Sequence, residues 1–313
     1  MGKKVVITGA LGLVGSHLVE GLLERGDSVI GVDNLKTGRR INLSPNTKAE
    51  LYIQDIADAD ILLDIVESFR PDVIIHCAAS YADPSDWIGD ATTNVLGSIK
   101  VAQAAKKVNA RVIYFQTALC YGLNPHMNPI PIDYPRNPAP SSYAISKTGG
   151  ELYLESSGVD LVTFRLANIV GPRNLSGALP IFFNRIANSQ KCTIAEARRD
   201  FVDVRDVVPL VLKAVDGIGK GAYHISSGAD VSILDLYNLV AGTFADANLP
   251  EPEIVPNPSL NAKSILLDPK KTIAEFGLIN FRPLSETVAA AVEFYKEYGV
   301  SEERTHFHFK AKS

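Results

Sequence analysis

The chain has 313 residues, 46% hydrophobic and 21% charged, which is ordinary for a globular protein and leaves room for one large domain with an appendage or for two domains. Its net charge of −4, without a basic stripe, disfavours a nucleic-acid partner, and no apolar run approaches the ~18–20 residues that span a bilayer. No Cys/His cluster has zinc spacing, so we expect no metal site. Three scattered cysteines exclude a disulfide framework, and a strand predicted within three residues of the N-terminus leaves no room for a signal peptide. We therefore expect a cytoplasmic protein.

The first forty residues predict a dinucleotide-binding unit. A buried strand over 3–8 is followed by a glycine-containing turn, a helix to about Arg25, and a second strand over 28–32. In such a unit the glycines allow a tight turn, close approach of backbone N–H groups to a pyrophosphate, and packing of the helix on the strand. The loop residues expected to bind the cofactor are Gly9, Gly12, Leu13, Val14 and Gly15.

The second strand ends at Asp33, where a carboxylate accepts hydrogen bonds from the ribose hydroxyls of adenosine. The same charge would repel a 2′-phosphate, so the sequence favours NAD over NADP as cofactor. We place the neighbouring Asn34 in the same site. A fortuitous glycine turn is the competing interpretation, and the correct elements on both sides of the loop argue against it.

Strands and helices alternate through about the first 170 residues, the pattern of a parallel doubly wound sheet. Further strands are predicted over 51–53, 72–76, 111–115 and 161–165, and further helices over 58–69, 92–108 and 141–156. The segment 124–140 contains six prolines, which exclude regular structure. We predict a long ordered loop over one edge of the sheet, and loops of this length are usually functional.

Candidate catalytic residues flank this loop. Thr117 ends the preceding strand, where its hydroxyl can bond a substrate oxygen or, alternatively, the backbone. Tyr143 and Lys147 open the following helix four residues apart, so their side chains share one face. A tyrosine with a pKa of about 10 is a poor base, and a neighbouring cation favours its phenolate. Such a pair also arises by chance on a solvated helix face, but beside a dinucleotide loop it predicts proton transfer.

After Gly171 the alternation breaks down. Helices are predicted over 178–188, 206–215, 233–244 and 284–298, and strands over 222–226 and 264–267. We interpret residues 1–170, with a returning segment near 200–227, as a Rossmann-type NAD-binding domain. Residues 171–313 form mostly a smaller, C-terminal substrate-binding lobe that caps the carboxyl ends of the strands. The tail after Ser301 could pair as an edge strand, and its His306 and His308 are weak metal candidates.

Together these motifs resemble the extended short-chain dehydrogenase/reductase family, the NAD-dependent nucleotide-sugar epimerases and dehydratases, over nearly the whole chain. Thr8-Gly9-x-x-Gly12-x-x-Gly15 is similar to the cofactor loop of that family, and Thr117, Tyr143 and Lys147 fall on its catalytic residues. Resemblance also implies cofactor contacts by Asp55, Ile56, Ala78, Ala79, Ser80, Asn94, Tyr143 and Lys147. The implied substrate contacts are Tyr81, Cys120, Asn168 and Arg199.

Within the family, the run at 117–122 and the closing run at 306–310 resemble the Wbm-type O-antigen sugar epimerases. The implied reaction inverts C4 of a UDP-linked hexose, N-acetylhexosamine or uronic acid through a transient 4-keto sugar. In that reaction Tyr143 takes the hydroxyl proton, Lys147 holds the nicotinamide ribose and lowers the pKa of the tyrosine, and Thr117 bonds the reacting oxygen. The cofactor is regenerated, so no second substrate is needed.

Departures from the family pattern bear on the alternatives. Family dehydratases carry an acid and a base where this chain has Ala118 and Leu119, which disfavours dehydration by that route. Segment 193–198 stands where the family has a glycine-rich turn, and segment 258–262 stands where it has an arginine. The identities of the sugar and of the nucleotide therefore stay open. The alternatives are a dehydratase, decarboxylase or reductase of the same family, and a non-catalytic NAD-binding regulator. The intact catalytic residues argue against the regulator.

The resemblance also implies assembly. The helices over 92–108 and 141–156 correspond to those that the family packs into a homodimeric four-helix bundle. Apolar positions on these helices leave more surface than one sheet face can cover, so we expect a homodimer. The positions concerned include Val95, Ile99, Val101 and Leu152.

Overall fold

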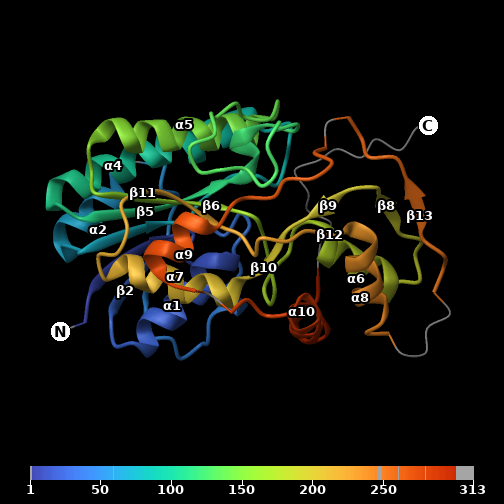
Figure 1. The fold of residues 1–313 in the computed structure, drawn as a ribbon. Coiled ribbons are helices and arrows are strands. Elements are labelled where there is room, and N and C mark those ends of the chain that lie inside the picture. The colour runs from blue at the N-terminus through green and yellow to red at the C-terminus, as the bar shows by residue number, and fades with distance from the viewer. Residues whose placement is uncertain (1, 59, 245–248, 260, 279, 301–313) are drawn as a thin grey trace.

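A seven-stranded sheet forms the centre of the computed structural model, which describes residues 2–58, 60–244, 249–259, 261–278 and 280–300 (Figure 1). All neighbouring strands pair in parallel, in the order β11-β6-β5-β4-β1-β2-β3. The strands are β1 (Lys4–Thr8), β2 (Ser28–Asp33), β3 (Glu50–Ile53), β4 (Val73–His76), β5 (Arg111–Thr117), β6 (Leu161–Leu166) and β11 (Gly221–Ile225). The strand order reverses between β1 and β4, and open parallel sheets bind ligands at such a switch point. The predicted Rossmann-type fold is confirmed.

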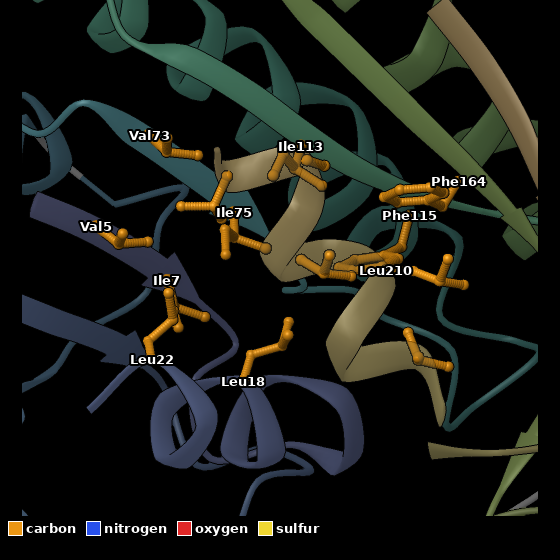
Figure 2. Packing of buried hydrophobic residues seen from close by; sticks show 14 of the residues in the cluster. Val5, Ile7, Leu18, Leu22, Val73, Ile75, Ile113, Phe115, Phe164 and Leu210 are labelled. Carbon is orange, nitrogen blue, oxygen red and sulfur yellow. The ribbon is translucent and has the colours of Figure 1, made fainter. Parts of the chain in front are cut away.

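Helices cover both faces of the sheet (Figure 1). One face carries α1 (Leu13–Glu24), α7 (Val204–Val215) and α9 (Lys270–Phe276), and the other carries α2 (Ile61–Phe69), α4 (Gly97–Val108) and α5 (Ser142–Ser157). Because side chains alternate along a strand, each of the strands β1 to β6 supplies both cores, while the edge strand β11 supplies only the first. Figure 2 shows the first core, where Val5 and Ile7 of β1 pack with Leu18 of α1 and Leu210 of α7.

Two predicted elements differ from the structure by more than three residues. The helix predicted to begin at residue 92 begins at Trp87 instead, as α3 (Trp87–Asp90) and a π-helical segment (Ala91–Leu96) that leads into α4. Asp86 caps its start by accepting the N–H of Gly89 at 2.9 Å. The strand predicted over 264–267 is wrong: only an isolated bridge joins Leu267 to Ile130. Prolines on both sides of Ile130 lack the N–H groups that a ladder needs.

The smaller lobe has a core of its own. The helices α6 (Ala178–Ala187), α8 (Ile233–Ala241) and α10 (Leu284–Tyr298) enclose it, close to the predicted positions. Three short strand pairs, which the sequence did not reveal, lie outside the seven-stranded sheet. They are β7 (Asn168–Val170) with β10 (Phe201–Asp203), β9 (Arg198–Arg199) with β12 (Val231–Ser232), and β8 (Thr193–Ala195) with β13 (Glu253–Val255). The pair of β8 and β13 is at the end of the lobe away from that sheet (Figure 1).

Among the described residues, no helix combines the length and apolar character that crossing a membrane requires. Within the same part of the chain, no group of three or more His, Cys, Asp or Glu side chains could hold a metal ion. The tail with His306 and His308 lies outside the described residues.

Candidate active site

A cleft of about 470 Å³ lies at the carboxyl ends of the central strands, between the sheet and the smaller lobe. Its walls come from the loops after β1, β2, β4, β5 and β6 and from the segment that precedes α6. The predicted site residues that line it are Gly9, Gly12, Leu13, Val14, Gly15, Asp33, Asn34, Ile56, Ala78, Ala79, Ser80, Tyr81, Thr117, Tyr143, Lys147, Asn168 and Arg199. Folding thus brings residues 190 positions apart (199 − 9) into one site.

The glycine loop leaves the first N–H groups of α1 available to a ligand. Gly12 precedes the helix without a side-chain cap, and the first turn holds no acidic residue. Unbonded N–H groups at a helix N-terminus attract anions. Gly9 has a φ of +69°, and a Cβ there would lie 2.6 Å from the backbone nitrogen of Ala78. The loop therefore lies against the end of β4 and tolerates no side chain at Gly9.

Asp33 is held in place by the backbone of two loops. Its carboxylate accepts the N–H of Leu11 at 2.9 Å and the N–H of Leu35 at 2.8 Å, and burial raises its pKa. Asn42, which the sequence analysis missed, donates to the carbonyl of Leu11 at 2.7 Å and also lines the cleft. Its Oδ1 is buried without a hydrogen-bond partner among the described residues. A ligand hydroxyl would satisfy this acceptor.

Two predicted cofactor residues act behind the cleft wall. Asp55 accepts from the Nδ2 of Asn34 at 2.8 Å, so it orients a residue that does line the cleft. The amide of Asn94 bonds both the N–H and the carbonyl of Ser80 at 2.9 Å and donates to Ser146 at 2.9 Å. Asn94 therefore fixes the loop after β4 rather than lining the cleft.

The predicted substrate contact by Cys120 needs correction. The residue is 0% exposed and lies in an apolar cluster with Ile130, Ile265 and Leu267, and it is not among the cleft-lining residues. Burial raises the pKa of its thiol to about 12, so the group is neutral at physiological pH. The single-turn helix after β5 turns the side chain inward, which the sequence pattern did not show.

The three catalytic candidates all line the cleft. The Thr117 hydroxyl accepts the N–H of Leu119 at 3.2 Å, and the ring of Tyr81 lies edge-on to Tyr143 with centroids 6.4 Å apart. Burial is the largest cause that raises the pKa of Tyr143, and the interaction with the Thr117 side chain opposes it. Lys147 is 4% exposed, its Nζ lies 4.0 Å from the ring centroid of Tyr114, and burial lowers its pKa to about 7. The lowering of the Tyr143 pKa by Lys147 stays a prediction.

A second uncapped helix start faces the cleft from the smaller lobe. Gly177, with a φ of +87°, precedes α6, which has neither a side-chain cap nor an acidic residue in its first turn. Sequence reasoning missed this site, although a glycine directly before an apolar run was the available signal. Arg199 lines the cleft nearby and donates to the carbonyl of Ala262 at 2.8 Å and to the side chain of Asn261. Burial lowers the pKa of Arg199 to about 10, so it stays cationic at neutral pH.

A dinucleotide-type sheet whose cleft also holds a Tyr-x-x-x-Lys pair is the arrangement of the short-chain dehydrogenases/reductases. More particularly, the chain belongs to the NAD dependent epimerase/dehydratase family, whose model matches residues 5–226. This finding confirms the family that the motifs indicated.

Comparisons with known proteins also support the resemblance to the Wbm enzymes. The structure of the Bordetella bronchiseptica enzyme WbmH in complex with NAD⁺ is 55% identical, with a TM-score of 0.93 over 95% of this chain and 100% of that chain. The same organism's WbmG, in complex with NAD and UDP, is 38% identical, with a TM-score of 0.86 over 97% of each chain. The UDP-glucose 4-epimerase of Mycolicibacterium smegmatis is 32% identical over 94% of this chain and 98% of its own length.

Proposed function

We propose that this protein is an NAD-dependent 4-epimerase of a UDP-linked sugar. The observation that carries the proposal is that Thr117, Tyr143 and Lys147 line one cleft together with two uncapped helix starts, those of α1 and α6. One helix start suits the pyrophosphate of a dinucleotide and the other the diphosphate of a nucleotide sugar. The similarity to WbmG with NAD and UDP and to a UDP-glucose 4-epimerase supports the same pairing of ligands.

The residues of the first half of the cleft fit NAD. The N–H groups of Leu13 and Val14 at the uncapped start of α1 would hold the pyrophosphate, and Asp33 and Asn42 would hold the adenosine ribose. When bound, NAD supplies the hydride acceptor for the sugar. Lys147 is the residue that would hold the nicotinamide ribose, because its buried side chain lines the same cleft.

The chain's own residues account for the proton transfer. Tyr143, as its phenolate, takes the proton from the C4 hydroxyl, and Thr117, whose side chain interacts with Tyr143, holds the reacting oxygen. Burial raises the pKa of Tyr143 and so disfavours its phenolate. Forming the phenolate that accepts the sugar proton therefore requires a positive charge close to this residue. Lys147, one helical turn further along α5, is the cation that we expect to supply it.

The second half of the cleft suits the nucleotide diphosphate. Arg199 supplies positive charge, Asn168 supplies an amide, and the start of α6 supplies unbonded N–H groups. Dehydration is the weaker alternative, because Ala118 and Leu119 line the cleft where an acid and a base would be needed. The retained Thr117, Tyr143 and Lys147 likewise argue against a non-catalytic regulator.

We also propose that the protein forms a homodimer through α4 and α5. Apolar side chains on and before these helices are exposed: Leu96 at 41%, Ile145 at 56%, Leu152 at 48% and Tyr153 at 51%. Val101 must be removed from the predicted interface, because it is fully buried against the sheet and packs in the core behind α4. The helix face turned to the sheet and the face left exposed are thus distinct.

The test is to incubate the purified protein with a panel of UDP-sugars and to resolve the products by NMR. We expect one pair of C4 epimers to interconvert, without net consumption of NAD, because hydride returns to the same carbon. A 4-keto-6-deoxy product, loss of CO₂, or net formation of NADH would assign the protein to another reaction of the family. Absence of turnover with every UDP-sugar of the panel would contradict the proposed substrate class.

A further inference from the structure

A buried carboxylate lies on the catalytic face of α5, one turn beyond Lys147. Glu151 is 0% exposed and follows Tyr143 and Lys147 at the same four-residue spacing. Its Oε1 accepts from Arg165 at 2.9 Å and 3.1 Å, and its Oε2 lies 3.2 Å from Nη1 of Arg136. Oε2 also accepts from the Nε2 of Gln116 at 2.9 Å. The proposed proton transfer uses none of these contacts.

Gln116 connects this carboxylate to Thr117. It is almost fully buried in β5, and its Oε1 accepts the backbone N–H of Thr117 at 2.8 Å. A carboxylate can only accept hydrogen bonds and a backbone N–H can only donate one. The amide of Gln116 therefore has a single orientation that satisfies both neighbours, and the bond to Glu151 holds the amide in it.

Thr117 lies where the sheet itself gives little support. On one side, β5 pairs with β4 only as far as Tyr114, while on the other side its pairing with β6 continues to Thr117. The last three residues of β5 thus overhang β4, and the next residue already belongs to a single-turn helix. The bond from the Thr117 N–H to Gln116 helps to fix the backbone at this overhang, and the Thr117 hydroxyl, which accepts the N–H of Leu119 at 3.2 Å, lines the cleft with Tyr143.

We propose that Glu151 is a positioning residue of the reaction: through the amide of Gln116, it holds Thr117 at the reacting oxygen. The proposal rests on the catalytic role assigned to Thr117 above. The competing account is that Glu151 only neutralises Arg165 and so stabilises the fold. Removing one partner of a buried ion pair is often strongly destabilising, so a change at Glu151 alone cannot separate the two accounts.

The test is therefore a double-mutant cycle between Gln116→Leu and Thr117→Val, with kcat and KM measured for the sugar that the panel identifies. Misplacement of a reacting group by about 1 Å costs on the order of 100-fold, so we expect Gln116→Leu to lower kcat about 10- to 100-fold. KM should change less than about twofold, because ground-state binding of the sugar is retained. In the Thr117→Val background, Gln116→Leu should cost less than about threefold, because the hydroxyl that it positions is already gone.

Controls separate the possible failures. Thr163→Val, a buried change in the neighbouring strand β6, should leave kcat unchanged. Glu151→Gln should lower kcat in the wild type and should leave kcat unchanged in the Thr117→Val background. Melting temperatures of every variant show whether the fold is retained. If the fold-losses of kcat in Gln116→Leu and Thr117→Val multiply in the double variant, the two residues act independently and the positioning role is overturned. A Thr117→Val variant with normal kcat would also overturn it. Tyr143→Phe tests the proposed function separately: if it is inactive while the cycle is multiplicative, the positioning role fails and the function stands.

Discussion

At the residue scale, burial changes the protonation behaviour of the groups in the cleft. It raises the pKa of Tyr143 and of Asp33 and lowers the pKa of Lys147 to about 7. Each shift disfavours the charged form, because a buried charge loses its hydration. A charged ligand in the cleft should therefore shift the pKa values of these residues.

The first prediction concerns Tyr143. Tyr143→Phe keeps the ring and its packing but deletes the proton acceptor, so NAD binding and folding should survive. Turnover should fall at least about 10²–10⁴-fold, the usual contribution of a general base. Tyr153→Phe, a change on the exposed side of the same helix, is the matched control and should keep full activity. More than about a tenth of wild-type turnover in Tyr143→Phe would exclude this residue as the base.

The second prediction concerns Lys147 and pH. Folding lowers the pKa of Lys147 from 10.5 to about 7, so between these values the unfolded chain holds a proton that the folded protein has released. Stability rises with pH wherever the unfolded state binds more protons. In NAD-free protein, the melting temperature of the wild type relative to Lys147→Met should therefore increase between about pH 7 and 9. A difference that is constant over this range would show that Lys147 is not desolvated.

The third prediction concerns cofactor choice. Because the Asp33 carboxylate lines the cleft, NADP should bind much more weakly than NAD in equilibrium titrations. Asp33→Asn removes the charge but keeps the size, and it should narrow the ratio of the two affinities by about tenfold or more, on the order of the interaction between two nearby charges. Equal or tighter binding of NADP by the wild type would contradict this role of Asp33.

At the scale of elements, two opposite faces of α5 carry different side chains. One face carries Tyr143, Lys147 and Glu151 toward the cleft and the buried network, and the opposite face exposes Ile145 and Leu152. A helix with apolar residues on two faces needs a partner on each, and the sheet covers only one of them. Catalytic geometry and the proposed dimer interface therefore depend on the same helix.

The prediction at this scale concerns the dimer. Leu152→Glu places a charge in the proposed contact between two α5 helices and should yield monomers by light scattering at micromolar concentration, where the wild type is dimeric. Leu278→Glu, a charge introduced at an exposed leucine outside α4 and α5, should leave the dimer intact. A monomeric wild type would contradict the proposed assembly.

At the scale of the whole molecule, the chain crosses repeatedly between the large sheet and the smaller lobe (Figure 1). After β6 and α6 it returns to the sheet as α7 and β11, whose side chains belong to the core shared with α1 and β1. We therefore propose that the returning segment beyond residue 170 belongs to the Rossmann domain. The cleft forms where the two parts of the chain face each other.

This arrangement predicts that α7 stabilises the NAD-binding half. Leu210→Ala removes a buried side chain between α7 and the sheet, and it should lower the free energy of unfolding by about 2–5 kcal/mol. Leu278→Ala, at an exposed position, should change it by less than about 0.5 kcal/mol. Urea unfolding at constant m-value measures both, and a neutral Leu210→Ala would show that α7 packs only loosely.

Spacing along the chain was enough to predict many of the strands, helices and site residues from the sequence alone. The glycine loop, the acid at the end of β2 and the Tyr143–Lys147 pair follow from short-range periodicity, because hydrophobic alternation and helix spacing act over a few residues. For the same reason the strands and helices of the first 170 residues were predicted almost completely. The strand predicted over 264–267 was wrong, because its pairing depends on the proline-rich loop more than a hundred residues earlier.

Only the tertiary structure decided the placements that depend on distant partners. Cys120 and Asn94 were expected in the cleft, but long-range packing directs the first into an apolar cluster and the second behind the loop after β4. The bonds that join Glu151 to Gln116 and Arg165, and the start of α6 facing the cleft, likewise connect segments far apart in the chain. A sequence specifies such contacts through the whole fold, because a side chain's neighbours across a sheet are set by topology and not by spacing along the chain.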